Sequence, residues 1–330
     1  MKKCYNGFQQ FVDESLEGIL MAYPSFYRMG NGDRRAILHP TEKRKVRIVT
    51  GGGYGHLPVF LGYVGEGLCD AVAVGNVFTS PSCEAILNAV RGLEPEEGVL
   101  FLFGNYFGDS MNFEMAGETL AQENIASRIV KMADDIASAP RSDYQSRRGI
   151  AGIAFAYKIA GACAAAGHNL DEVASIAEDT VANTASFGVA FSSCILPGQE
   201  KPVFDIAEGE MEIGMGIHGE PGVDHGPMQA SAEIAHKLGN AVTEDLSLQP
   251  GERIAVLVNG LGATSREELF IFYRDVRRVL DGLGLITASS YVGEFATSLE
   301  MSGISLSILR LNQEREMYLN AACYTPFISF

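Results

Sequence analysis

The chain has 330 residues, 47% of them hydrophobic and 20% charged, a composition that excludes intrinsic disorder and a fibrous repeat. Its 41 acidic residues against 25 basic ones give a formal net charge of −16, which argues against a dedicated role in binding nucleic acid or an anionic membrane surface. The length suggests two domains and permits one large one. Two short basic clusters, Lys43–Lys45 and Arg147–Arg148, are interpreted as solvated loop faces.

No stretch reaches the roughly 18 consecutive apolar residues that a membrane span needs, and the start of the chain is charged without an apolar segment. We therefore expect neither a membrane anchor nor a signal peptide. The six cysteines are far apart and form no C-x-x-C pair, so they are interpreted as small buried apolar side chains rather than as disulfides or metal ligands. Together these features predict a cytoplasmic protein.

The first half of the chain alternates helical and strand-like segments. Apolar residues recur every three or four positions over residues 8–20, which predicts an amphipathic helix. The segments 46–50 and 98–103 are each typical of a buried strand, and each ends at glycine. A helix is predicted between them over residues 80–92. Strand, glycine turn, helix and strand in this order indicate a mostly parallel α/β sheet.

The second half contains further helices and strands. Two helices are predicted within 150–182, with Asn169 as the N-cap of the second and Glu172 completing a capping box. Beyond about residue 184 the pattern changes, and we expect a helix from Ser265 and strands at 211–217, 254–258, 285–290 and 304–311. The predicted fold class is α/β, with two α/β domains at 1–184 and 185–330. Each domain is expected to be a mostly parallel or mixed sheet covered by helices.

A glycine-rich loop with a histidine follows the first strand. In open α/β sheets ligands bind at the carboxyl ends of the strands, and Gly51–Pro58 places His56 at such an end. Glycines allow the backbone to approach a small ligand closely. The loop matches neither the dinucleotide fingerprint nor a Walker-type phosphate loop. The residues alone leave open a tight structural turn that carries a surface histidine.

Asp109 lies just after the second predicted strand, in Gly104–Asn112. A carboxylate between apolar neighbours is partly desolvated and suits a general base toward a hydroxyl group. The alternative is that Asp109 caps a helix that starts near Ser110.

A third glycine-rich segment, Gly214–Gly222, contains His218. A neutral imidazole flanked by glycines is an open nucleophile that can add to a carbonyl carbon. Together with Glu220, Asp224 and His225 the same residue could instead belong to a metal site, although the spacing matches no common ligand motif. The sequence therefore predicts three reactive side chains at glycine-rich turns.

These segments, in this order, resemble the substrate-binding K subunit of the dihydroxyacetone kinases, of which the chain looks like a divergent member. The resemblance covers essentially the whole chain. It is carried by the segments Gly51–His56, Gly75–Ser82, Asn105–Phe113, Arg148–Gly152, Gly216–Gly222, Val258–Thr264 and Tyr291–Met301.

The resemblance implies a mechanism. His218 would add to the ketone carbonyl of dihydroxyacetone to give a covalent hemiaminal, Asp109 would take the proton from the hydroxyl that receives phosphate, and His56 would assist. No metal is expected at this site. The substrate-binding residues that the resemblance implies are Gly53, Tyr54, Gly55, His56, Gly104, Asp109 and His218.

The family also implies partners. The phosphoryl group would come from a separate nucleotide-carrying L-type subunit with bound ADP or ATP and Mg, recharged in some members by a phosphotransferase-system protein. This chain would bind no cofactor itself, and it would form a homodimer.

The sequence departs from the family pattern around the expected pocket. Tyr54 stands where the family usually has serine, Leu57 replaces glutamate, Gly104 replaces lysine, Phe107 replaces threonine and Tyr157 replaces histidine. Two interpretations follow. The chain is a kinase subunit for dihydroxyacetone or a C4 ketose such as erythrulose, or it binds a ketose without phosphorylating it and acts as a coactivator for a transcriptional regulator.

Overall fold

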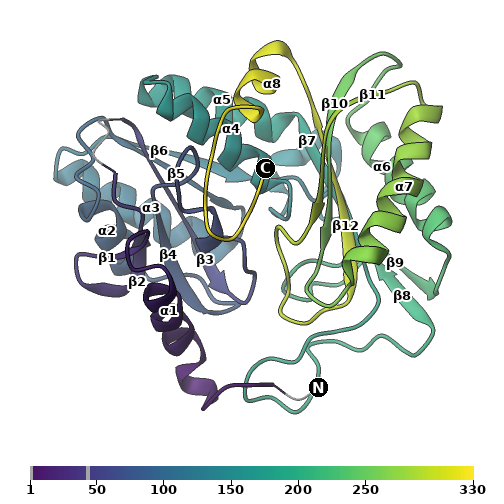
Figure 1. Ribbon diagram of the computed structural model, residues 1–330, viewed down its shortest axis with the longest axis horizontal. Coiled ribbons are helices and arrows are strands. Elements are labelled where there is room, and N and C mark those ends of the chain that lie inside the picture. The colour runs from purple at the N-terminus through teal and green to yellow at the C-terminus, as the bar shows by residue number, and fades with distance from the viewer. Residues whose placement is uncertain (1–2, 42–44) are drawn as a thin grey trace.

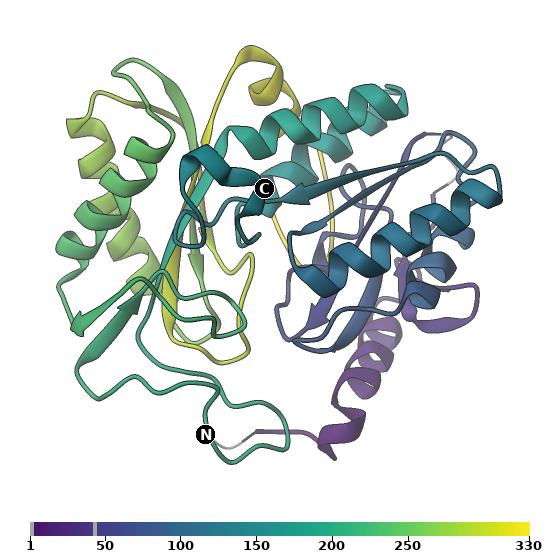
Figure 2. The same cartoon turned by 180° about the vertical axis from the view of Figure 1, so that it is seen from behind.

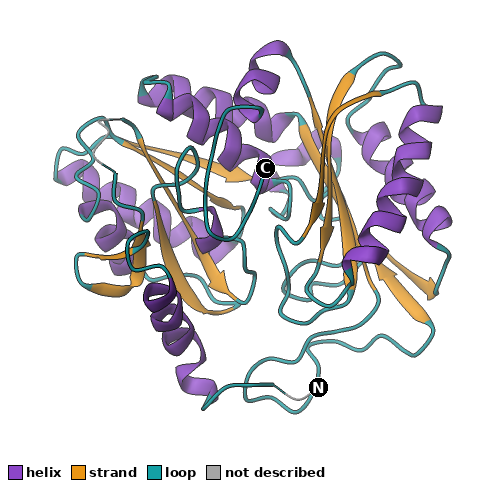
Figure 3. Cartoon of the chain, in the orientation of Figure 1, coloured by secondary structure: helices purple, strands orange, loops and turns teal. Residues whose placement is uncertain are grey.

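The computed structural model describes residues 3–41 and 45–330, so Lys43 and Arg44 of the first basic cluster lie outside the described residues. The first half forms a six-stranded mixed sheet (Figures 1 and 3), in the order β1-β2-β4-β3-β5-β6. Strands β3 to β6 are mutually parallel where they pair, and β1 and β2 extend the sheet antiparallel. The bounds are β1 Arg28–Gly30, β2 Asp33–Leu38, β3 Arg47–Tyr54, β4 Ala71–Val77, β5 Val99–Gly104 and β6 Ser127–Met132.

Helices cover both faces of this sheet. On β5, Phe101 and Phe103 pack with α2 and α3 on one face, seen from behind in Figure 2, whereas Leu100 and Leu102 pack with α4 and α5 on the other. Because both faces are covered, β5 is apolar at every position, as its sequence predicts. The helices of this half are η1 Phe8–Gln10, α1 Phe11–Ala22, η2 Leu61–Tyr63, α2 Cys83–Arg91, α3 Phe107–Gln122, η3 Arg141–Ser146, α4 Ile153–Ala165 and α5 Leu170–Ala182.

A second six-stranded sheet begins at Thr184, with the order β11-β10-β12-β7-β8-β9. Only β10 and β11 pair in parallel, and the remaining pairs are antiparallel. Helices α6 and α7 cover its outer face. The bounds are β7 Thr184–Ala190, β8 Glu210–Ile213, β9 Asp224–Pro227, α6 Ser231–Asp245, β10 Arg253–Gly260, α7 Arg266–Gly282, β11 Ile286–Gly293, β12 Gly303–Arg310 and α8 Gln313–Leu319.

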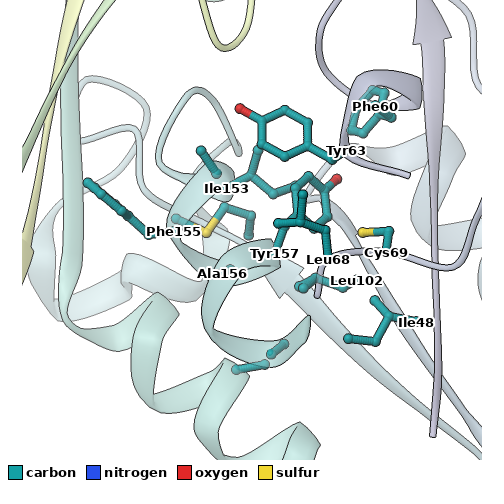
Figure 4. Packing of buried hydrophobic residues seen from close by; sticks show 14 of the residues in the cluster. Ile48, Phe60, Tyr63, Leu68, Cys69, Leu102, Ile153, Phe155, Ala156 and Tyr157 are labelled. Carbon is teal, nitrogen blue, oxygen red and sulfur yellow. The ribbon is translucent and has the colours of Figure 1, made fainter. Parts of the chain in front are cut away.

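One hydrophobic core lies between the two sheets. Its cluster joins Ile48 and Leu102 of the first sheet to the helical residues Phe155 and Tyr157 of α4, as Figure 4 shows, and continues to Leu257 of the second sheet. The two-sheet α/β class is therefore confirmed. The division at residue 184 stays a prediction, because a shared core ties the two halves together.

Several element boundaries differ from expectation. The first strand does not stop at Gly51 but runs to Tyr54, and the strand predicted over 211–217 ends at Ile213, before Gly214 with its positive φ of 81°. The predicted capping box of Asn169 and Glu172 is present. Ser82 and Ser265 cap α2 and α7 through side-chain hydrogen bonds. Among the described residues, no helix is long and apolar enough to cross a membrane.

The interpretation of the basic clusters as solvated is wrong at three positions. Arg147 is buried and donates two hydrogen bonds to the carboxylate of Asp245, at 2.9 and 2.6 Å. Arg148 pairs with the buried Asp135 at 2.8 Å. Lys45 is mostly buried and pairs with Asp70 at 2.6 Å. Each arginine or lysine thus neutralises a carboxylate inside the fold, which its neighbours in sequence do not reveal.

Candidate active site

At the end of β3 the backbone passes very close to the segment of Phe78 and Thr79, and this contact positions His56. A Cβ atom on Gly53 would lie 2.7 Å from the backbone nitrogen of Thr79 and 2.8 Å from Cα of Phe78, so only glycine allows the two segments to meet. Gly55 has a φ of 105°, which a larger residue rarely adopts. These two glycines thus bring the ring of Phe78 onto His56.

His56 is completely buried, so the alternative of a surface histidine is wrong. Its Nδ1 lies 2.7 Å from the carbonyl oxygen of Thr297, which accepts a hydrogen bond, and its ring stacks on Phe78 with centroids 4.7 Å apart. Burial, with help from nearby His218, lowers the pKa of His56 to about 3. The ring is therefore neutral with its proton on Nδ1, and the Nε2 atom is a buried acceptor without a partner in the structure.

His218 lies in the loop between β8 and β9 and meets His56 edge to face, with ring centroids 4.7 Å apart. Its Nδ1 is 3.1 Å from one carboxylate oxygen of Glu220, and its backbone N–H donates to the other at 3.0 Å. A carboxylate can only accept here, so the Nδ1 position carries the proton and the lone pair of the neutral ring is on Nε2. Tyr106 packs its ring against His218 at 4.6 Å.

Glu220 is a permanent carboxylate. Burial raises its pKa, but the hydrogen bond and charge of His218, with a smaller contribution from Arg148, outweigh burial and bring the pKa to about 2. Arg148 is fixed by the buried Asp135 and places its Nη1 3.9 Å from Glu220. This chain of charges holds the imidazole of His218 in one orientation and one tautomer.

Asp109 lies in the first turn of α3, which begins at Phe107, so the interpretation that it caps a helix from Ser110 is wrong. Its side chain is only 4% exposed, and its Oδ1 atom has no hydrogen-bond partner. Burial raises its pKa to about 6, although Ser80 and the charge of His218 act in the opposite direction. A carboxylate with such a pKa is ionised at neutral pH and basic enough to take a proton.

The remaining positions expected at the site fall into two groups. Gly53 and Gly55 adjoin His56, and Gly104 ends β5 close to the ring of Tyr106. The side chain of Tyr54 instead packs toward α1, where its hydroxyl lies 2.5 Å from that of Ser15. Two further positions differ from the family pattern. The hydroxyl of Tyr157 on α4 forms a hydrogen bond with the hydroxyl of Thr50 on β3, and Phe107 is 86% exposed at the start of α3.

Three residues of the site, Phe78, Tyr106 and Thr297, were not singled out in the sequence, and Glu220 was considered only as a candidate metal ligand. Phe78 and Tyr106 lie within the segments that carry the family resemblance, and an aromatic residue two to three positions after a glycine is the only signal they offer. Thr297 reaches His56 across 241 positions of sequence, and no local pattern indicates that contact.

The arrangement defines what a ligand must bring. Two buried acceptors, Nε2 of His56 and Oδ1 of Asp109, lie near a nucleophilic nitrogen of His218, and leaving such atoms unpaired costs about 1–3 kcal/mol each. A molecule with hydroxyl donors and an electrophilic carbon satisfies all three. Within 3–41 and 45–330, no group of three or more His, Cys, Asp or Glu side chains is arranged to hold a metal ion. Asp224 pairs instead with Lys237 at 2.5 Å.

Comparison with known proteins gives the class. Residues 17–327 match the Dak1 domain, so the chain belongs to the Dak1 family. It is 40% identical over 329 residues to the protein named PTS-dependent dihydroxyacetone kinase 2, dihydroxyacetone-binding subunit DhaK, of Listeria innocua, covering 99% of each chain.

Two further relatives differ in named role. The D-erythrulose kinase of Mycolicibacterium smegmatis is 42% identical over 326 residues, which cover 99% of this chain and 56% of that protein, so this chain spans about half of it. A solved structure named dihydroxyacetone kinase operon co-activator matches with a TM-score of 0.88 and 33% identity, covering 94% of this chain and 96% of the other.

Proposed function

We propose that this chain is the substrate-binding subunit of a short-chain ketose kinase, a phosphotransferase that acts on an alcohol group. The observation that carries the proposal is the pair of unpartnered buried acceptors beside His218. A short hydroxyketone offers the hydroxyl donors and the carbonyl that this pair and the imidazole require, whereas a polyol lacks the carbonyl.

In the first step His218 binds the ketose covalently. The Nε2 lone pair attacks the carbonyl carbon, a C–N bond forms, the C=O π bond breaks, and the oxygen takes up a proton from water to give a hemiaminal. The ring becomes cationic because its Nδ1 proton is retained, and the carboxylate of Glu220, 3.1 Å away, balances that charge. His56 accepts a hydrogen bond from a ligand hydroxyl through Nε2.

In the second step Asp109 takes the proton of the terminal hydroxyl as its oxygen attacks the phosphoryl group. The donor is a nucleotide with Mg on a separate subunit, which we place with this chain in the cytoplasm. Relatives named PTS-dependent, such as the Listeria innocua subunit, support a phosphotransferase-system protein as the ultimate source.

The surface beside Asp109 supports docking of that subunit. Phe107, Met111 and Met115 recur every four residues along α3 and are 86%, 48% and 50% exposed, forming an apolar stripe that starts at the catalytic turn. We propose that the donor subunit covers this stripe during transfer. We also propose that the chain forms a homodimer, as the family resemblance implies.

The substrate is dihydroxyacetone or erythrulose, since relatives of both names match the chain over 99% of its length. A second function, a ketose-dependent coactivator without transfer, is favoured by the named role of the structure that matches with a TM-score of 0.88. The unpaired, basic Asp109 favours the kinase, because a protein that only senses ketose needs no base.

A direct test uses His218→Ala, with His236→Ala as the control because His236 is an exposed histidine on α6. Ketose binding is measured by carbon NMR with carbonyl-labelled dihydroxyacetone and erythrulose. We expect the carbonyl resonance to move to the hemiaminal region in the native protein and in His236→Ala only. A hemiaminal signal that survives in His218→Ala would overturn the proposal, and phosphate transfer with the captured donor subunit separates kinase from coactivator.

A further inference from the structure

A hollow lies at the end of the first sheet where β3 and β5 begin, opposite to the end that carries His56 and Asp109. Its volume is about 700 Å³, within the range of small-molecule sites, and Arg28, Lys45 and Arg47 contribute to its lining. Arg47 begins β3 and pairs in register with Val99, the first residue of the parallel strand β5. His56 and Asp109 follow the carboxyl ends of those strands, which point toward the second sheet in Figure 3. The hollow is therefore separate from the candidate active site.

Arg47 is the most unusual side chain in this hollow. It is only 7% exposed, yet among residues 3–41 and 45–330 its Nε and Nη1 atoms have no hydrogen-bond partner. Within the same residues it pairs with Asp70, whose Oδ1 lies 3.7 Å from Nη1, beyond hydrogen-bond distance. A guanidinium stays charged at every physiological pH, so burial without partners is costly unless an anion approaches it.

Asp70 does not supply that anion by itself. Its Oδ2 accepts a 2.6 Å hydrogen bond from Lys45 Nζ and a 2.8 Å bond from the backbone N–H of Ile48. Two buried cations thus share one carboxylate. Among the residues that the structure describes, one positive charge at the floor of the hollow is therefore left without a buried counter-charge.

The exposed rim limits which anion fits. Glu94, Glu96 and Glu97 line the hollow and are exposed to solvent, where water and salt weaken their effect on the floor. They disfavour a polyanion such as a nucleotide triphosphate or nucleic acid. Arg28 is exposed, and its Nη2 donates to the carbonyl of Gly92 at 3.1 Å, leaving other N–H groups for a ligand.

We propose that this hollow binds a single phosphate group, either inorganic phosphate or the phosphate of a small sugar phosphate, through Arg47, Lys45 and Arg28. The phosphate oxygens complete the unpaired guanidinium of Arg47. A free phosphate does not fill the hollow. The remaining volume accommodates an uncharged group of a few carbon atoms, such as the carbon chain of a small sugar phosphate.

The test titrates inorganic phosphate and, separately, glycerol 3-phosphate, and follows binding by phosphorus NMR. Glycerol 3-phosphate has no carbonyl, so it cannot form a hemiaminal with His218. The variants are Arg47→Met and Arg28→Gln. Because Arg28 is exposed, Arg28→Gln should fold normally even if the substitution of the buried Arg47 prevents folding. Arg128→Gln is the matched control, since Arg128 is 53% exposed and pairs with an exposed carboxylate.

We expect both probes to bind the native chain, Arg128→Gln and His218→Ala alike, and Arg47→Met and Arg28→Gln to weaken binding at least tenfold. Tighter binding of glycerol 3-phosphate assigns the site to a sugar phosphate, and equal binding assigns it to phosphate itself. No binding of either probe by the native chain, or unchanged binding in Arg28→Gln, overturns the proposal. His218→Ala removes the proposed ketose reaction and leaves this hollow unchanged. A failure of the phosphate-site proposal can therefore be distinguished from a failure of the proposed function.

Discussion

Asp109→Asn is predicted to stabilise the protein while it abolishes turnover. The ordinary pKa of an aspartate is 3.8, and burial raises that of Asp109 to about 6. At 1.36 kcal/mol for each tenfold change, the difference corresponds to about 3 kcal/mol of free energy of unfolding. The native state binds this proton more tightly than the unfolded state, so stability is lost as the pH rises from about 4 to about 6 and stays reduced above that. Asparagine carries no charge and avoids the loss.

The assay is urea denaturation of both proteins across that pH range, in which all other titrating groups cancel from the difference. We expect Asp109→Asn to be more stable by up to about 3 kcal/mol at neutral pH and equal near pH 4. Asp171→Asn is the control, because Asp171 is 74% exposed and should change stability by less than about 0.5 kcal/mol. A stability difference that does not vary with pH would refute the reasoning, because it would mean that folding does not raise the pKa of Asp109.

Three further predictions concern the reaction. Turnover with the donor subunit should fall as the pH drops through about 6, because Asp109 becomes protonated; a pH–rate profile that stays flat there contradicts the assignment of the base. Glu220→Gln should weaken ketose binding at least tenfold in a calorimetric titration, because the cationic hemiaminal ring loses its counter-charge; unchanged affinity would show that His218 needs no carboxylate. Phe107→Asp should leave ketose binding intact and reduce transfer from the donor subunit. The control Met29→Asp, which alters a methionine 43% exposed on β1, should change neither binding nor transfer, and normal transfer in Phe107→Asp argues against docking on α3.

Local patterns in the sequence predict several of the strands and helices that are strongly apolar or well capped, although the apolar strand β4 was not predicted. The segment 98–103 and the helix capped by Asn169 fall within a residue or two of their observed bounds. The sequence misses β7, whose TASFGVA has little hydrophobic contrast, and it misses the continuation of β3 through three glycines. Glycine has weak strand propensity, and the pairing of Gly51 and Gly52 with Ala73 and Val74 of β4, which no local pattern encodes, keeps this part of β3 extended.

The candidate site was predictable at its reactive atoms but not at the groups that orient them. Histidine and aspartate beside glycine turns stand out because few residues accept or donate protons near neutral pH. The tautomer of His56 depends on Thr297, and the environment of Glu220 depends on Arg148, which looked like a solvated charge. Such contacts arise from tertiary packing, which single-sequence periodicity does not report.

The hydrogen bond from His56 to Thr297 bears on how such a protein can be divided. The acceptor for the imidazole proton comes from the segment between β11 and β12, near the end of the chain, and the same segment donates from Leu299 to the carbonyl of Gly55 at 2.8 Å. A fragment that holds only the first sheet would therefore keep His56 and Asp109 in its sequence but lose the contact that fixes the tautomer of His56. Mixing the two halves of different relatives to change substrate preference should fail unless the segment 297–299 travels with the loop that carries His56.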